Sequence, residues 1–304
     1  MPDPKNKNKN LMLIILSSVL LLTLLVLLVG FIFTRPKTTV GFDGERAYRD
    51  VKYQVGLGAR TPGGSAHSRV RQWIGDELRK SGWSVEEQEL ESMGHPIFNL
   101  IATRGVGKPW VVLGAHFDSR FLADHDPVAS NQTQPVPGAN DGASGVAVLL
   151  ELARTLPKDI PGKVSLVFFD AEDNGKIPGW DWILGSTAYV NALQEKPDMA
   201  VILDMIGDAD LNIHYEKNSD PVISQEIWRT AENLGYGNVF IQTQKYSILD
   251  DHTPFLSAGI RAVDIIDFDY PYYHTTQDTP DKVSAESLKA VGNTIHAWLL
   301  SIMD

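Results

Sequence analysis

The sequence predicts an α/β fold with a mixed, largely parallel central sheet flanked by helices, preceded by one transmembrane helix. Short apolar runs alternate along the chain with longer segments in which apolar residues recur at helical spacing. This alternation of strand and helix is typical of parallel strands connected by helices. An uncharged stretch near the N-terminus stands apart from the pattern.

The uncharged stretch covers residues 11–33 and predicts the transmembrane helix. It holds 23 residues without an Asp, Glu, Lys or Arg, and about 20 apolar residues cross a bilayer as a helix. Three lysines precede it and two basic residues follow, which favours a cytoplasmic N-terminus. We therefore expect a single-pass membrane protein with a short cytoplasmic tail at residues 1–10, an anchor at 11–33, a linker at 34–44 and an extracytoplasmic domain at 45–304.

Four short apolar runs of this domain predict buried strands. Gly, Pro or Asp bounds several of them, and the run at 164–169 is rich in β-branched and aromatic residues. In chain order, the expected strands are residues 111–113, 164–169, 199–203 and 262–266.

Five segments with helical spacing predict helices. Gly82, Pro157 and Gly235 end the first, second and fourth of them, and Ser284 is a suitable N-cap for the last. The Pro- and Gly-bearing stretch at 126–138 predicts a loop. In chain order, the expected helices are residues 70–78, 145–156, 186–193, 222–234 and 284–303.

Composition limits the chemistry that the chain can perform. It has no cysteine, which excludes disulfides, thiolate metal sites and a cysteine nucleophile. Its 38 acidic residues outnumber 27 basic ones, for a formal net charge of −11, which argues against nucleic acid as a partner. Any bound metal ion must therefore be held by histidine and carboxylate side chains.

Histidines and acids cluster where the predicted strands end. In parallel sheets the carboxyl ends of the strands meet at one edge, where chemistry gathers. Carboxylates crowded there repel one another unless a cation neutralises them, and His with carboxylate suits a catalytic zinc ion. The residues expected at this edge are His116, Asp141, Glu172, Asp173, Asp204 and His274.

The adjacent pair Glu172 and Asp173 predicts two carboxylates with separate roles. One carboxylate can bind metal while its neighbour, which points elsewhere, carries a proton. Asp118 follows His116 by two residues and is expected to orient the ring of that histidine, a support that metal-bound histidine usually has.

Five motifs resemble the zinc aminopeptidase and glutaminyl cyclase superfamily. They occur in the order of that superfamily and extend over nearly all of residues 45–304. The resemblance implies a zinc aminopeptidase-like fold and an enzyme that acts on peptide or protein N-termini. The motifs are GAHFDS at 114–119, GANDGASG at 138–145, FDAED at 169–173, LDMIG at 203–207 and YHT at 273–275.

The resemblance implies different zinc numbers for the two kinds of enzyme. In the two-zinc aminopeptidases, Asp141 would bridge the ions, His116 and Asp204 would hold one, and Asp173 and His274 the other. Glu172 would then be the base that activates water. In the glutaminyl cyclases, a single zinc remains on Asp141, Asp173 and His274. There Glu172 would carry the proton, helped by Asp204 and Asp250.

The resemblance favours the cyclases. The stretch DDHTPF at 250–255 is similar to theirs, whereas peptidases more often have Ser or Thr before Asp-His. The resemblance implies Trp180 in the substrate pocket, with the nearby Trp182 as the alternative at that position. Tyr273 is also expected there, although cyclases commonly have Trp in its place. We therefore expect a glutaminyl-peptide cyclotransferase. The alternatives are a zinc metalloaminopeptidase and, less favoured, a non-catalytic ectodomain on the same fold.

Overall fold

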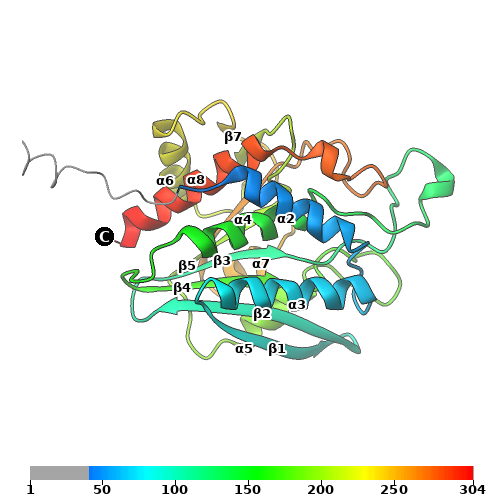
Figure 1. Ribbon diagram of the computed structural model, residues 1–304, viewed down its shortest axis with the longest axis horizontal. Coiled ribbons are helices and arrows are strands. Elements are labelled where there is room, and N and C mark those ends of the chain that lie inside the picture. Colours follow the sequence, from blue (N-terminus) through cyan, green and yellow to red (C-terminus); the bar gives the residue numbers. More distant parts are fainter. Residues whose placement is uncertain (1–40, 304) are drawn as a thin grey trace, which may run out of the picture. The chain divides into compact units, whose positions relative to one another are not determined.

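A six-stranded sheet lies at the centre of the structure, a computed structural model that describes residues 41–303 (Figure 1). The strand order is β1-β2-β4-β3-β5-β8, and β6 and β7 form a separate two-stranded sheet. The strands are β1 (Ser84–Ser92), β2 (His95–Gly105), β3 (Trp110–His116), β4 (Lys163–Phe169), β5 (Met199–Asp204), β6 (Ile213–Tyr215), β7 (Phe240–Gln244) and β8 (Arg261–Ile266). The helices are α2 (Gly44–Gly56), α3 (Ser65–Lys80), α4 (Ala143–Thr155), α5 (Leu184–Ala192), α6 (Pro221–Asn233), α7 (Thr253–Ser257) and α8 (Ala285–Met303), with 3-10 turns at Ala129–Asn131 and Pro280–Lys282.

Four neighbouring strands of the large sheet are parallel. These are β4, β3, β5 and β8, whereas β2 pairs antiparallel with both β4 and β1. His116 at the end of β3 lies opposite Phe169 at the end of β4, and Asp204 at the end of β5 lies opposite Ile266 at the end of β8. The predicted mixed, largely parallel sheet is confirmed, and the carboxyl ends of four strands share one edge.

Alternate residues of the parallel strands contribute to two hydrophobic cores. Val111 and Leu113 of β3 belong to the larger core, which α2, α3, α4, α6 and α8 complete. Val112, between them, belongs to the smaller core together with Tyr189 of α5 and Phe255 of α7. Figure 1 shows α2, α4 and α8 stacked over one face of the sheet. Because both faces are covered, these strands have continuous apolar runs rather than an alternating pattern.

The predicted strands and helices are confirmed to within a few residues at each end. The predictions missed α2 and the hairpin of β1 and β2, as well as the short β6, β7 and α7. In β1 the sequence SVEEQELES contains four glutamates, and no residue of the strand is buried. A charged edge strand of this kind lacks the apolar run that marks a buried strand.

The folded domain begins slightly before the predicted boundary at residue 45. Phe42 is buried, and its ring packs against Gly292 of α8. Asp43 caps α2 by accepting the backbone N–H of Arg46. The predicted tail at 1–10, the anchor at 11–33 and the linker up to residue 40 lie outside the described residues. Within residues 41–303, every helix is too short or too polar to cross a membrane.

Gly145 allows α4 to lie against the end of β5. A Cβ atom at this position would lie 2.2 Å from the backbone oxygen of Leu203 and 2.8 Å from the Cβ of Ala115. We predict that Gly145→Ala lowers the free energy of unfolding by about 1–3 kcal/mol or more, as overpacked cores do. Denaturant unfolding measures this change.

Gly56→Ala is the matched control for this substitution. Gly56 also lies in a helix, but a Cβ atom there would have no atom within 4 Å, and alanine is the better helix former. Equal stability of the two variants would contradict the close approach of α4 to β5.

Candidate active site

The predicted metal-ligating and proton-carrying residues all reach the carboxyl edge of the sheet. Two of them end strands, and the others lie in the segments that directly follow a strand or precede a helix. The parallel register brings these chain positions together, although they are far apart in sequence. They are His116 and Asp204 at the ends of β3 and β5, Glu172 and Asp173 after β4, Asp141 before α4 and His274 after β8.

Three residues at this edge have strained backbone conformations. Ala171, Met205 and His274 have φ angles of 52°, 45° and 57°, in the left-handed region that costs non-glycine residues of order 1–3 kcal/mol. Ala171 directly precedes Glu172, and Met205 directly follows Asp204. The strain therefore occurs where the chain turns acidic and histidine side chains toward one another, and the surrounding sheet must hold it in place.

Two groups of metal-ligand type share Asp141. In the first, His116 Nε2 lies 3.2 Å from Oδ1 of both Asp141 and Asp204. In the second, His274 Nε2 lies 2.7 Å from Asp173 Oδ1 and 3.6 Å from Asp141 Oδ2. Within each group the donor atoms lie within 4.8 Å of one another. Asp141 thus offers one oxygen to each group, so the edge could hold one ion or two ions bridged by this carboxylate.

Buried oxygen atoms without hydrogen-bond donors show that these residues fit a cation. Oδ2 of Asp141 and Oδ2 of Asp173 are both buried, and neither has a hydrogen-bond donor in the part of the chain that the structure describes. Such atoms are costly in a folded protein unless an ion or water satisfies them. The donors are nitrogen and oxygen, without sulfur, and they come from both histidine and carboxylate. This set suits zinc in a catalytic site.

Two further carboxylates hold the ligands in place. The backbone N–H of Asp141 donates to Asp278 Oδ2 at 3.1 Å. Asp118 Oδ1 lies 3.4 Å from His116 Nδ1, at the outer limit of a hydrogen bond, and accepts the backbone N–H of Glu172 at 3.0 Å. Asp118 therefore faces the ring of His116, as the sequence predicts, and it also fixes the backbone that carries Glu172.

Burial and mutual repulsion raise the pKa values of three acids at this edge, Glu172, Asp173 and Asp204. Burial raises the pKa of Asp173 to about 6, and the charge of Asp141 adds to the increase. Burial also raises the pKa of Asp204 to about 7, with Asp250 adding to the increase. For Glu172 burial again dominates, and its pKa lies well above the usual range. The charged forms of these three carboxyl groups are therefore disfavoured at this edge unless a cation compensates their charge.

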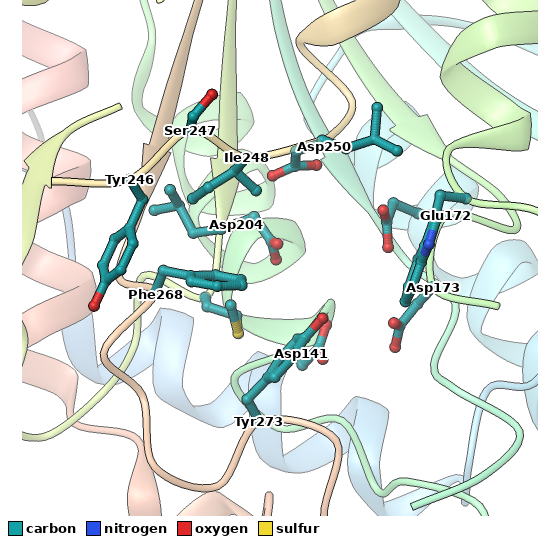
Figure 2. A pocket seen from close by; sticks show the side chains of 14 residues that line it. Asp141, Glu172, Asp173, Asp204, Tyr246, Ser247, Ile248, Asp250, Phe268 and Tyr273 are labelled. Atoms are coloured by element: carbon teal, nitrogen blue, oxygen red, sulfur yellow. The ribbon is translucent and has the colours of Figure 1, made fainter. Parts of the chain in front are cut away.

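The acidic residues open onto a cavity of about 210 Å³ (Figure 2). Its volume is below the roughly 300–1,000 Å³ of pockets for drug-sized ligands, so it suits a group about the size of one amino-acid residue. Figure 2 shows Glu172, Asp204 and Asp250 with their carboxyl groups turned toward the same space. The aromatic part of its wall is formed by Trp182, Tyr246, Phe268 and Tyr273.

The structure corrects the predicted pocket tryptophan. Trp182, not Trp180, lines the cavity, and its ring stacks over His274 with 5.9 Å between ring centres. The backbone of Trp182 forms an isolated antiparallel β-bridge with that of Asp173, which places Trp182 beside the predicted metal ligands. Trp180 stacks instead on His95, 3.8 Å away, outside the cavity lining. Tyr273 lines the cavity, as the sequence predicts.

Several residues near the site carry no signal in the sequence. Asp278 lies 137 residues after Asp141 in the chain, and only the fold brings the two together. Asp124 and His125 directly precede the expected loop at 126–138, and no motif marks them, yet they lie beside His274. Asp251, by contrast, lies within the DDH stretch and is fully buried, so that motif already pointed to it.

A third buried cluster lies behind the cavity. It comprises Asp250, His252 and Asp264, whose donor atoms lie within 4.8 Å of one another. His252 Nε2 lies 3.4 Å from Glu216 and His252 Nδ1 lies 3.7 Å from Asp264. The cluster extends the acidic network from Asp250 at the cavity into the protein interior.

Comparison with known proteins places this site in a family. Residues 99–299 match the model of the family described as peptidase family M28. Among curated proteins, aminopeptidase YwaD of Bacillus subtilis is 33% identical over 183 residues. That match takes in 53% of this chain but 37% of YwaD, so this chain spans well under half the length of that relative.

Solved structures agree with this assignment over most of the chain. A glutaminyl cyclase from Porphyromonas gingivalis is 33% identical with a TM-score of 0.79, covering 85% of this chain and 98% of its own. A leucine aminopeptidase precursor from Bacteroides thetaiotaomicron is 32% identical with a TM-score of 0.81, covering 86% and 97%. The two named activities therefore occur at nearly the same similarity to this chain.

Proposed function

The chain belongs to peptidase family M28, and we propose that it is a zinc-dependent glutaminyl-peptide cyclotransferase. Such an enzyme converts an N-terminal glutamine to pyroglutamate and releases ammonia. Its substrates would be peptide or protein N-termini. The small cavity at the sheet edge supports a substrate that inserts one terminal residue, and the shared donor set around Asp141 supports zinc.

The position of Asp250 is the observation that carries this proposal. Its side chain lines the cavity together with Glu172 and Asp204, and it belongs to the DDH stretch that resembles the cyclases. Both reactions move a proton from the attacking group, water or amine, to the nitrogen that leaves. Cyclisation must move a proton from the attacking amine to the departing ammonia within one substrate, and several carboxyl groups around the reacting atoms suit that transfer.

Each of these residues at the sheet edge would have its own role in the cyclisation. When bound to Asp141, Asp173 and His274, zinc would supply Lewis acidity to the side-chain carbonyl of the substrate glutamine. The α-amine of the same residue forms the new C–N bond as the bond to the amide nitrogen breaks. Glu172 takes the proton from the amine and delivers it to the departing ammonia. Asp204 and Asp250 would hold Glu172 in the protonation state that each step requires.

The second candidate is a zinc aminopeptidase, and a specific observation favours it. The two oxygens of Asp141 face the two different histidines, 3.2 Å from His116 and 3.6 Å from His274. This arrangement suits two bridged ions, in which case Glu172 would deprotonate a water molecule that attacks the first peptide bond. A non-catalytic protein on this fold is less well supported, because the ligand-type residues and Glu172 are all present at one edge.

The reaction product separates the two enzymes. Purified protein loaded with zinc is incubated with a peptide that begins with glutamine, and the product is measured by mass spectrometry. We expect the mass of the peptide to fall by one ammonia. Release of free glutamine and a peptide shortened by one residue would establish the aminopeptidase instead. An unchanged peptide with zinc-loaded protein would contradict both activities for this substrate.

Substitution of the two adjacent acids tests their separate roles. We predict that Glu172→Gln keeps the fold and the zinc but lowers kcat by about a hundredfold or more, the usual contribution of a general acid–base group. Asp173→Asn is the matched control, since it weakens a ligand and should lower zinc content and activity together. Zinc content and kcat, measured for both variants, show which acid binds the ion and which carries the proton. Loss of zinc in Glu172→Gln with full zinc in Asp173→Asn would reverse the assignment.

We also propose that residues 11–33 anchor the domain in a membrane, with the catalytic domain on the extracytoplasmic side. The proposal rests on the uncharged 23-residue segment alone. The full-length protein should sediment with membranes and resist carbonate extraction, while a version that begins at Thr39 should stay in the supernatant. Release of the full-length protein by carbonate would rule out an integral anchor.

A further inference from the structure

One nitrogen of His274 has no role in the site described so far. Its Nε2 faces Asp173 and Asp141, so this atom is the one placed to bind metal. Its Nδ1 is buried, and among residues 41–303 it has no hydrogen-bond partner. A histidine that binds metal through one nitrogen carries a proton on the other, and that N–H normally donates to a carboxylate, carbonyl or water.

Asp124 is the carboxylate that faces this nitrogen. Its Oδ1 lies 3.8 Å from His274 Nδ1, slightly beyond hydrogen-bond distance. The side chain of Asp124 is 40% exposed, so it has room to rotate by the small amount that would close the gap. No residue of the predicted ligand set supplies an acceptor on this side of the ring.

Arg120 holds Asp124 in position. The Arg120 guanidinium donates to both oxygens of Asp124, at 2.8 Å from Nε and 2.7 Å from Nη2. Arg120 itself is buried, and its Nη1 donates to the backbone oxygen of Asp173 at 2.9 Å. One fixed cation therefore connects the carboxylate beside His274 with the backbone of a second ligand.

The same loop also holds the backbone around His274. The backbone N–H of His125 donates to the oxygen of His274 at 3.2 Å. Asp126 accepts the backbone N–H of Thr276 at 3.0 Å and its hydroxyl at 2.5 Å. His274 has a φ of 57°, and these contacts keep the chain in that unfavourable conformation.

We propose that Asp124 is a positioning residue for the metal site: it accepts the Nδ1–H of His274 when Nε2 binds the ion. Arg120 keeps the Asp124 carboxylate charged and aimed at the ring. The hydrogen bond fixes the ring orientation and makes Nε2 a better donor to the ion. This inference rests on the metal set of the proposed function, and it holds for the cyclase and for the aminopeptidase, since His274 is a ligand in both.

Zinc affinity tests the proposal. Full-length wild-type protein, Asp124→Ala and Asp124→Asn are stripped of metal and titrated with zinc against a chelator of known affinity. We expect Asp124→Ala to bind zinc about 10–100-fold more weakly, the usual effect of losing such a partner. Asp124→Asn should lose less, because its amide oxygen can still accept the N–H. Should the alanine variant fail to fold, the asparagine variant decides, with an expected loss of several-fold.

Asp159→Ala is the matched control. Asp159 is exposed and precedes β4, at the opposite end of the sheet, so this change removes a negative charge without touching the site. It should leave zinc affinity within twofold of wild type. The melting temperature of each metal-free variant separates the two effects, because loss of the Arg120 pair lowers metal-free stability, whereas a positioning role lowers zinc affinity beyond what that loss explains.

The results distinguish this proposal from the proposed function. Wild-type affinity in Asp124→Ala, or a loss matched by metal-free destabilisation, would overturn the role of Asp124 alone. Wild-type protein that binds no zinc would overturn the proposed function itself.

Discussion

The concentration of buried carboxyl groups at one end of a parallel sheet is the constraint on which the rest of this structure depends. Asp141, Glu172, Asp173, Asp204 and Asp250 are all at least nine-tenths buried, and they face one cavity. Charged groups in such a place are costly unless opposite charge or hydrogen bonds compensate them. The neighbouring histidines, backbone N–H groups and a metal ion are the compensation that this fold can offer.

The scaffold around the cavity fixes the backbone segments that carry these acids. Asp118 and Asp278 accept N–H groups from the segments that carry Glu172 and Asp141. Arg60, fully buried, donates to backbone oxygens at the start of the Asp141 segment. Close approach at Gly145 fixes the helix that follows this segment. The carboxyl groups therefore have fixed orientations before an ion binds. Electrostatic catalysis requires groups that are preorganised in this way.

The same set of groups can serve two reactions, and this explains why cyclases and aminopeptidases share the fold. Both need an ion that polarises a carbonyl group, a carboxylate that moves a proton and a cavity that admits one terminal residue. The difference lies in whether the attacking group is the amine of the substrate or a water molecule. In this chain the acids around Glu172, Asp250 above all, are the basis of the proposed internal proton transfer, whereas the shared Asp141 would also allow a second ion.

The apolar runs alone predict the parallel strands, and with them the position of nearly every expected metal ligand. Buried strands have continuous apolar runs, and an acid or histidine that follows such a run must lie at the carboxyl edge. Only the tertiary structure decided that Trp182 rather than Trp180 lines the cavity, that Asp278 supports Asp141 and that Asp124 faces His274. The charged edge strand β1 escaped prediction because half-exposed strands need no apolar run. The contacts of Trp182, Asp278 and Asp124 depend on the paths of the loops between elements. No local pattern in the sequence predicts which distant side chain a loop will contact.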